Sequence, residues 1–204
     1  MKNLFRWFNK IFFAWSLGLF FLPRVKYEGK KCPKGPVIFV TNHKNQMDFL
    51  LMLWVFYFRY LRCLVGKTFY ECNGLITFVL RMLGAIKVDR FAFDMDFFYE
   101  SVDALNKKQS LLIFPEGKFS TTGEIAEFRD TAALLAVQTG APVVPVYHST
   151  RYGIGKRVDV VIGEPIDLSA MCKTENPDPQ ELKAMTAILR DKVIALQEMA
   201  GKGK

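Results

Sequence analysis

The stretch that decides the fold is VIFVTNHKNQMDFLLMLWVF, residues 37–56. It opens with four β-branched or aromatic residues, which indicate a buried strand, and it closes with an apolar run that is typical of a buried helix. His43 and Asp48 lie between these two elements. Five residues turn an ideal helix through about 500°, so the two side chains cannot share a helical face. The spacing therefore predicts a strand, a loop that carries His43, and a helix starting near residue 46 whose first turn lets Asp48 reach back to the imidazole.

The remainder of the chain alternates extended and helical patterns. Extended runs lie near residues 36–41, 61–65, 85–88, 110–114, 142–147 and 157–162. Helical patterns lie near residues 46–58, 68–82, 94–107, 128–139 and 178–199. Strands that alternate with helices predict an α/β fold, with a mixed sheet flanked by helices. In open α/β sheets the reactive groups gather at the carboxyl ends of the strands, and His43 follows such an end.

The amino-acid composition of the chain indicates what kind of partner its surface would bind. The 204 residues carry nineteen phenylalanines, three tryptophans and a net charge of +8, with a mean hydropathy of +0.11. A surface that is both apolar and basic suits an anionic membrane surface or an acidic partner. No zinc-finger spacing, aromatic RNA-binding signature or basic helix supports nucleic acid as the partner. The cysteines form no Cys-x-x-Cys pair, so we expect reduced thiols in an intracellular protein and no metal site. They are Cys32, Cys63, Cys72 and Cys172.

The N-terminus carries a short apolar segment, residues 11–22, which follows three basic residues. The segment lacks a small-x-small cleavage site and is shorter than the roughly 20 apolar residues that a membrane-spanning helix needs. It predicts an interfacial helix over residues 3–21 that holds the protein on the cytoplasmic face of a membrane as a peripheral, monotopic protein. We therefore expect a membrane-associating helix over residues 1–23 and a single folded domain over residues 24–204.

Four short sequence blocks contain polar residues, glycine or proline next to apolar runs. They are NHKNQMD at 42–48, VDR at 88–90, FPEGKFS at 114–120 and PVVPV at 142–146. In this order and at these distances the blocks resemble the glycerolipid acyltransferase family, typified by 1-acyl-glycerol-3-phosphate acyltransferase. The resemblance covers roughly residues 24 to 165 and implies a glycerol-3-phosphate acyltransferase-like fold.

The resemblance implies a reaction. A fatty acyl group would move from a thioester of coenzyme A or acyl carrier protein, as a substrate and not a cofactor, to the free hydroxyl of 1-acyl-glycerol-3-phosphate. The product would be phosphatidic acid, and the partners would be a membrane surface, a lysophospholipid and acyl carrier protein. His43 and Asp48 form the HxxxxD motif of the family, which makes them the expected catalytic pair.

The chemistry of His43 agrees with this role. An alcohol is a poor nucleophile at neutral pH, so a base must remove its proton as it attacks, and imidazole is the usual base. A carboxylate on the other ring nitrogen fixes the tautomer and stabilises the imidazolium that forms. No serine or cysteine adjoins the histidine in sequence, so we expect direct transfer without a covalent acyl-enzyme. Backbone N–H groups near Gly117, or at the start of the helix that contains Asp48, are the candidates for binding the oxyanion.

The resemblance also implies substrate-binding residues. Arg90 would help to hold the acceptor phosphate, although a surface arginine paired with a neighbouring aspartate is the alternative. Glu116 would either hydrogen-bond the acceptor or brace its own loop. Members of the family usually carry Glu-Gly-Thr-Arg-Ser in the third block, whereas this chain has Phe119 at the arginine position. Lys118, which follows Gly117, and Arg129 supply other cations nearby.

Three functional classes stay open. The first is the acyltransferase, for which Phe119 leaves room for glycerol-3-phosphate or another lyso-lipid as the acceptor. An acyl thioesterase would use the same pair with water as the acceptor. A non-catalytic membrane-surface protein would use the aromatic and basic segments alone. Some of the aromatic residues in the run 49–58 are candidates for lining an acyl tunnel, and we expect Pro145 to shape a strand and His148 to be structural or exposed.

Overall fold

The computed structural model describes residues 22–89, 95–120, 123–149, 152–153, 156–172 and 177–201. The expected N-terminal helix over residues 3–21 and the candidate Arg90 lie outside these residues. No helix within the described ranges is both long and apolar enough to cross a bilayer.

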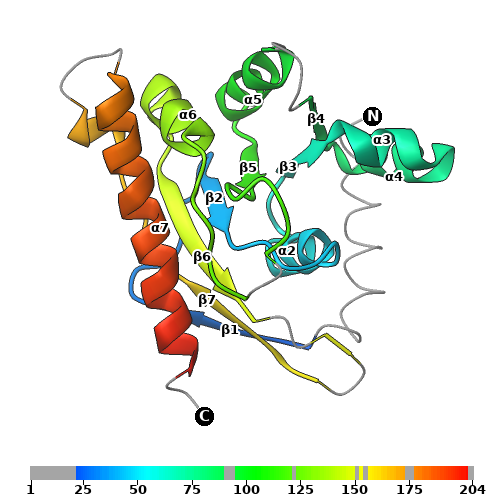
Figure 1. Ribbon diagram of the computed structural model, residues 1–204, viewed down its shortest axis with the longest axis horizontal. Coiled ribbons are helices and arrows are strands. Elements are labelled where there is room, and N and C mark those ends of the chain that lie inside the picture. Colours follow the sequence, from blue (N-terminus) through cyan, green and yellow to red (C-terminus); the bar gives the residue numbers. More distant parts are fainter. Residues whose placement is uncertain are drawn as a thin grey trace.

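A seven-stranded mixed sheet forms the centre of the described domain, in the order β1-β7-β6-β2-β5-β3-β4 (Figure 1). The strands are β1 (Pro23–Tyr27), β2 (Ile38–Thr41), β3 (Leu61–Gly66), β4 (Ile86–Val88), β5 (Ser110–Ile113), β6 (Val143–His148) and β7 (Val158–Ile162). Neighbouring strands run parallel, except that β7 pairs antiparallel with β6. The expected α/β fold with a mixed sheet is therefore confirmed.

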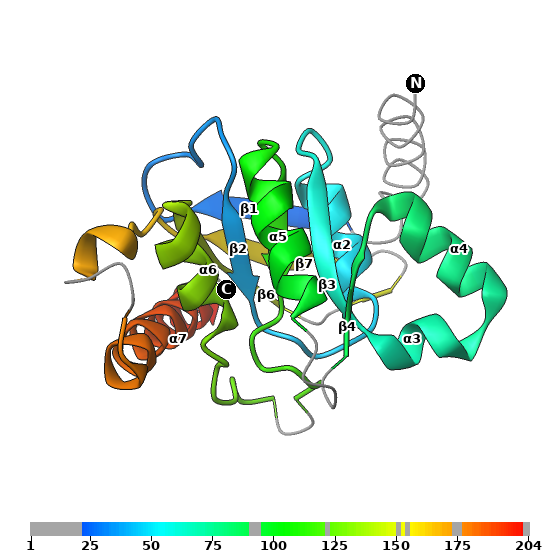
Figure 2. The same cartoon turned by 90° about the horizontal axis from the view of Figure 1, so that it is seen from above.

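Helices cover both faces of the sheet. They are α2 (Asp48–Val55), α3 (Lys67–Cys72), α4 (Gly74–Leu83), α5 (Asp96–Asn106), α6 (Thr131–Thr139) and α7 (Pro179–Gly201), with a short 3₁₀ turn at Ser169–Met171. Ile38 and Val40 of β2 pack in one core with α5, α6 and α7, whereas Phe39 packs in a second core with α2. This alternation follows from the two-residue period of a strand. Both views place α3 and α4 at the β4 end of the sheet (Figures 1 and 2).

The structure differs from the sequence expectation in two elements. The helical pattern over 68–82 is divided into α3 and α4 at Asn73, whose side chain accepts a 2.8 Å hydrogen bond from the N–H of Leu75 and so begins a new helix. Strand β1 was not expected. It is an exposed edge strand with Arg24 and Lys26 in its short sequence, and its pairing with β7 comes from tertiary contact and not from an apolar pattern.

Candidate active site

The site begins where β2 ends. After Thr41 the chain forms a loop that carries His43, and α2 starts at Asp48, so the carboxylate of the first helical turn faces back toward the loop. Oδ2 of Asp48 lies 3.1 Å from Nδ1 of His43. This is the arrangement that the five-residue spacing predicts. With Nδ1 donating to the carboxylate, Nε2 carries the lone pair, and it makes no hydrogen bond with any described residue.

Asp48 is fully buried, and its charge is satisfied by several donors. Besides His43, its Oδ2 accepts hydrogen bonds from the backbone N–H groups of Lys44 at 2.7 Å and Asn45 at 2.8 Å. Burial by itself raises the pKa of this carboxyl. The hydrogen bond from His43, the nearby His148, and the donors Tyr152 and Asn45 outweigh burial and hold the pKa of Asp48 below its usual value. Asp48 is therefore an anion that orients the imidazole.

A second buried histidine lies behind this pair. His148, the last residue of β6, is fully buried, and its Nε2 lies 2.9 Å from the backbone oxygen of Asn42 and 3.8 Å from Oδ2 of Asp48. The side chain of Asn42 joins the same two strand ends, because it accepts from the N–H of His148 at 3.0 Å and donates to its carbonyl at 3.1 Å. Of the two readings that the sequence left open for His148, the structure supports the buried, structural one.

Tyr152 reaches the same carboxylate from the segment that follows β6. Its hydroxyl donates a short hydrogen bond to Oδ1 of Asp48. Sequence reasoning did not find this residue. Tyr152 belongs to none of the four blocks, and no local spacing links it to Asp48.

The third sequence block braces the histidine loop. Glu116 is almost fully buried, and its Oε1 accepts a 2.7 Å hydrogen bond from the N–H of His43 while its Oε2 accepts one of 3.0 Å from the N–H of Ala126. The N–H of Ser120 then donates to the carbonyl of His43 at 2.8 Å. Both carboxylate oxygens of Glu116 thus bind backbone groups, which is the bracing role of the two that the sequence left open.

Two phenylalanines of the same block contact the imidazole. The ring of Phe114 stacks on His43 with centroids 3.9 Å apart, and the tilted ring of Phe119 lies at 4.3 Å. Phe119 therefore fixes the plane of the imidazole from a position where the family usually has arginine. Only 14% of the histidine side chain stays exposed.

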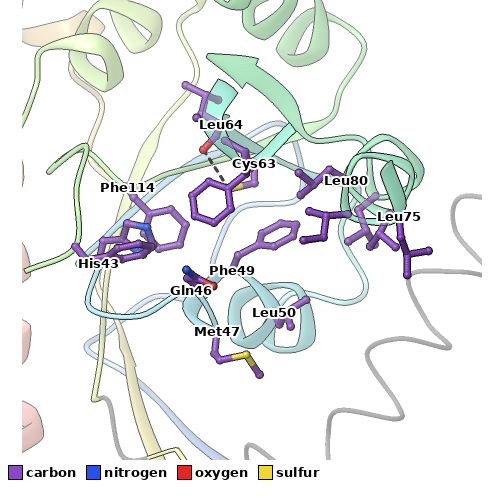
Figure 3. A pocket seen from close by; sticks show the side chains of 17 residues that line it. His43, Gln46, Met47, Phe49, Leu50, Cys63, Leu64, Leu75, Leu80 and Phe114 are labelled. Carbon is purple, nitrogen blue, oxygen red and sulfur yellow. Dashed lines mark hydrogen bonds between the residues drawn. The ribbon is translucent and has the colours of Figure 1, made fainter. Parts of the chain in front are cut away.

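An apolar cavity of about 400 Å³ opens beside the histidine. Figure 3 shows His43 and Phe114 at one end and Leu75 at the other, with residues of α2, β3 and α4 between them. The lining residues include Met47, Phe49, Leu50, Val65, Phe69, Val79, Leu80 and Phe119. Of the aromatic run expected to line a tunnel, Phe49 lies on this wall. A nearly hydrocarbon-lined space suits an acyl chain better than a polar ligand.

Two other candidate substrate-binding residues, Gly117 and Lys118, follow Glu116 in the same loop. Lys118 is exposed to solvent. Gly117 has a φ of +70°, and a Cβ built on it would lie 2.8 Å from Nε of Arg129, so the guanidinium packs against the glycine backbone. The positive φ is what favours glycine at this position.

Two of the candidate oxyanion donors, the N–H groups of Gly117 and Asp48 themselves, are already hydrogen-bonded within the protein. The N–H of Gly117 donates to the carbonyl of Phe114 at 3.1 Å, and the N–H of Asp48 donates to that of Asn45 at 3.1 Å. Neither N–H as it stands is free to bind an oxyanion. The described residues also contain no group of three or more histidine, cysteine or acidic side chains that would hold a metal ion.

The comparisons with known proteins agree with this geometry. Residues 24–149 match the family described as Acyltransferase. The chain belongs to the acyltransferase family. A chloroplastic 1-acyl-sn-glycerol-3-phosphate acyltransferase of Brassica napus is 30% identical over 125 residues, which cover 59% of this chain and 34% of that protein. Its counterpart in Arabidopsis thaliana is 27% identical over 149 residues, covering 69% and 39%. The chain thus matches less than half of the length of these plant relatives.

A solved structure supports the fold. The 1-acyl-sn-glycerophosphate acyltransferase PlsC from Thermotoga maritima aligns with a TM-score of 0.68 and 22% sequence identity. The alignment covers 100% of this chain and 80% of that one. At this level of identity the likeness concerns the fold alone.

Proposed function

We propose that this acyltransferase-family protein transfers a fatty acyl group from an acyl thioester to the free hydroxyl of 1-acyl-glycerol-3-phosphate, giving phosphatidic acid in phospholipid biosynthesis. The observation that carries the proposal is the His43 ring, which is oriented by Asp48 through Nδ1 and lies on the wall of an apolar cavity. The substrate class is supported by the names of the plant relatives.

The proposed reaction uses His43 twice. Nε2 takes the proton of the acceptor hydroxyl as its oxygen attacks the thioester carbonyl carbon, so a C–O bond forms. The tetrahedral intermediate then collapses, the C–S bond breaks, and the imidazolium returns its proton to the leaving thiolate. Asp48 balances the positive charge while the proton is on the ring. No serine or cysteine nucleophile takes part, so the transfer occurs within one ternary complex.

The apolar cavity would bind the acyl chain of the donor. Its lining from α2, β3 and α4 is apolar, and it starts at the base, so a chain inserted there would present its thioester carbon to His43. The donor is a coenzyme A or acyl carrier protein thioester. A net charge of +8 would attract the phosphates of the coenzyme or an acidic carrier.

The acceptor phosphate would bind on the polar side of the loop. Arg90, Lys118 and Arg129 are the cations that we propose for it, with Gly117 and Glu116 shaping and bracing the loop. The Arg129 side chain lies against Gly117 and is exposed to solvent. We propose that this exposed guanidinium donates to the acceptor phosphate.

A different acceptor is the second candidate. Phe119 contacts the imidazole and lines the cavity where the family usually has an arginine. An apolar ring beside the base favours an acceptor whose phosphate lies elsewhere, or another lyso-lipid.

The first test is an acceptor panel. Purified protein would receive a labelled acyl thioester, detergent micelles and, separately, 1-acyl-glycerol-3-phosphate, glycerol-3-phosphate or other lyso-lipids, with products measured by mass spectrometry. We expect phosphatidic acid from the wild type, and a loss of at least about 100-fold in His43→Ala with an unchanged thermal melt. Acylation of another lyso-lipid alone would establish the second candidate. Free fatty acid without any acylated acceptor, or activity that survives in His43→Ala, would overturn the proposal.

We further propose a peripheral location on the cytoplasmic face of a membrane, with residues 24–204 as the catalytic domain and residues 1–23 as a membrane-associating segment. On α4, Leu75 and Phe78 are 70% and 63% exposed, and Leu75 also lines the cavity. An apolar surface at the cavity rim would let a lipid pass from the bilayer to the base.

Vesicle sedimentation tests the location. Wild-type protein should bind anionic vesicles more strongly than zwitterionic ones, and the double substitution Leu75→Ser with Phe78→Ser should weaken binding to both. The matched control is Met199→Ser on α7, which removes another exposed apolar side chain far along the sequence. Equal binding of all three proteins would contradict a role for α4 at the membrane.

A further inference from the structure

The two oxygens of Asp48 have different partners. Oδ2 accepts from His43 Nδ1 and from two backbone N–H groups of the loop. Oδ1 points the other way and accepts from the hydroxyl of Tyr152. Within the described part of the chain, Tyr152 is the one donor to Oδ1. The carboxylate is therefore held at both ends, by the loop on one side and by the segment after β6 on the other.

The hydroxyl proton lies on the tyrosine. Tyr152 is half-buried and packs beside the core formed by α2 and the sheet. Burial, the negative charge of Asp48 and the hydrogen bond to it all raise the pKa of the Tyr152 phenol, while the pKa of Asp48 is lowered. A phenol next to an anion keeps its proton and donates it in the hydrogen bond.

His148 lies close to the same carboxylate without pairing with it. Burial lowers the pKa of its imidazole, although the charge of Asp48 acts in the opposite direction. The ring is thus neutral, and the 2.9 Å contact of Nε2 with the carbonyl of Asn42 places its one proton on Nε2. The 3.8 Å separation from Oδ2 of Asp48 is too long for a hydrogen bond. His148 therefore makes no hydrogen bond to Asp48, and its Nδ1 lies 3.5 Å from the hydroxyl oxygen of Tyr152.

We propose that Tyr152 is a positioning residue for the base, acting through Asp48: its hydroxyl holds Oδ1 so that Oδ2 stays directed at Nδ1 of His43. The neutral His148 completes this arrangement by occupying the space behind the carboxylate. The expected effect of Tyr152 on kcat rests on the proposed function. Its effect on the tautomer of His43 does not depend on any substrate.

The hydroxyl has two effects on the chemistry. It prevents rotation of the carboxylate about its Cβ–Cγ bond, which would misdirect Oδ2. It also stabilises the anion, so that when His43 takes up the acceptor proton at Nε2, the Nδ1 proton stays on the ring and does not pass to Asp48. Without it, Oδ1 would be a buried charged oxygen lacking its donor, which is costly.

Kinetics of Tyr152→Phe give the first test. The substitution keeps the ring in the core and removes only the hydroxyl. We expect kcat to fall about tenfold, as for loss of a hydrogen bond to a charged group, with the KM values of both substrates little changed. The control is Tyr70→Phe on α3, which removes the 2.9 Å hydrogen bond from the Tyr70 hydroxyl to the carbonyl of Ala85. An unchanged kcat in Tyr152→Phe, or equal losses in both variants, would overturn the proposal.

Nitrogen-15 NMR of the imidazoles gives a second test that needs no substrate. The chain has two histidines, so selective labelling yields two ring systems. We expect opposite tautomers in the wild type, with the proton of His43 on Nδ1 and that of His148 on Nε2. In Tyr152→Phe the His43 signals should shift toward a mixture of tautomers, and in Tyr70→Phe they should not. If His43 keeps its pattern in Tyr152→Phe, the positioning role is wrong, whatever the enzyme acylates. If the pattern shifts in a protein without acyltransferase activity, the proposed function alone fails.

Discussion

The backbone N–H of His43 donates a 2.7 Å hydrogen bond to Oε1 of Glu116, so the proposed base is held by a residue of the third sequence block. The other oxygen of Glu116 binds the N–H of Ala126, which connects the histidine loop to the segment before α6. A buried carboxylate that accepts hydrogen bonds from two N–H groups links the two segments that carry them.

The first prediction concerns the two hydrogen bonds that Glu116 accepts. In Glu116→Gln the amide offers one oxygen and one NH₂ group, so one backbone N–H must face a donor. We expect the free energy of unfolding to fall by about 1–3 kcal/mol and kcat to fall with it, since the loop of His43 is released. Denaturant unfolding and steady-state kinetics measure the two effects. The control is Glu127→Gln, an exposed carboxylate of the same segment. A Glu116→Gln protein as stable and active as Glu127→Gln would show that the two hydrogen bonds contribute nothing.

The second prediction concerns Arg129. Its guanidinium packs against Gly117, next to Glu116, so removal of its charge should weaken binding of a phosphorylated acceptor. In Arg129→Gln we expect the KM for 1-acyl-glycerol-3-phosphate to rise about tenfold while kcat changes little, as for the loss of one charge-assisted contact. The control is Lys192→Gln on α7, which lowers the net charge by the same amount at an exposed position. Equal KM values in the two variants would remove Arg129 from the phosphate site.

How far sequence reasoning reached depends on whether a feature is local. The contact between His43 and Asp48 was predictable because five residues, a strand end and a helix start determine it. The bracing role of Glu116 was one of two open readings, since sequence does not show which backbone N–H groups come near a carboxylate. Tyr152 was missed because its contact with Asp48 joins the segment after β6 to the start of α2, and only the folded sheet brings those two segments together.

The third prediction concerns the pH dependence of stability. Burial lowers the pKa of His148 in the folded protein below the value of about 6.5 that histidine has in an unfolded chain. Between these two values the unfolded state binds more protons, so the free energy of unfolding rises with pH. The stability from the neutral His148 is therefore fully present above about pH 6.5 and is lost as the pH falls toward the folded pKa.

Denaturant unfolding at a series of pH values from about 7.5 down to 5 checks this, with His148→Gln as the comparison. Glutamine can still donate to the carbonyl of Asn42 but cannot take up a proton. The wild type should lose more stability on acidification than the variant. Because His43 is present in both proteins, the difference reports on His148. The lowered pKa of Asp48 acts in the same direction but in a more acidic window, below about pH 4. Parallel curves for the two proteins would contradict the assignment of a neutral, buried His148.

The last prediction concerns the length of the acyl chain. Leu80 of α4 lies on the wall of the cavity opposite His43 (Figure 3), and its side chain is 8% exposed. A chain that starts at the base and runs toward α4 would meet this residue, so its size should set how much chain fits. We expect Leu80→Trp to shift the preferred donor to shorter acyl groups and Leu80→Ala to shift it to longer ones, in competition assays with mixed acyl thioesters. Leu80→Ala also costs about 2–5 kcal/mol of stability. Leu189→Ala, in the core that contains α5, α6 and α7, has a similar cost and serves as its control. Leu189→Ala should lose stability without changing the chain-length preference. An identical shift in both alanine variants would mean that the preference follows general loosening of the fold and not the cavity.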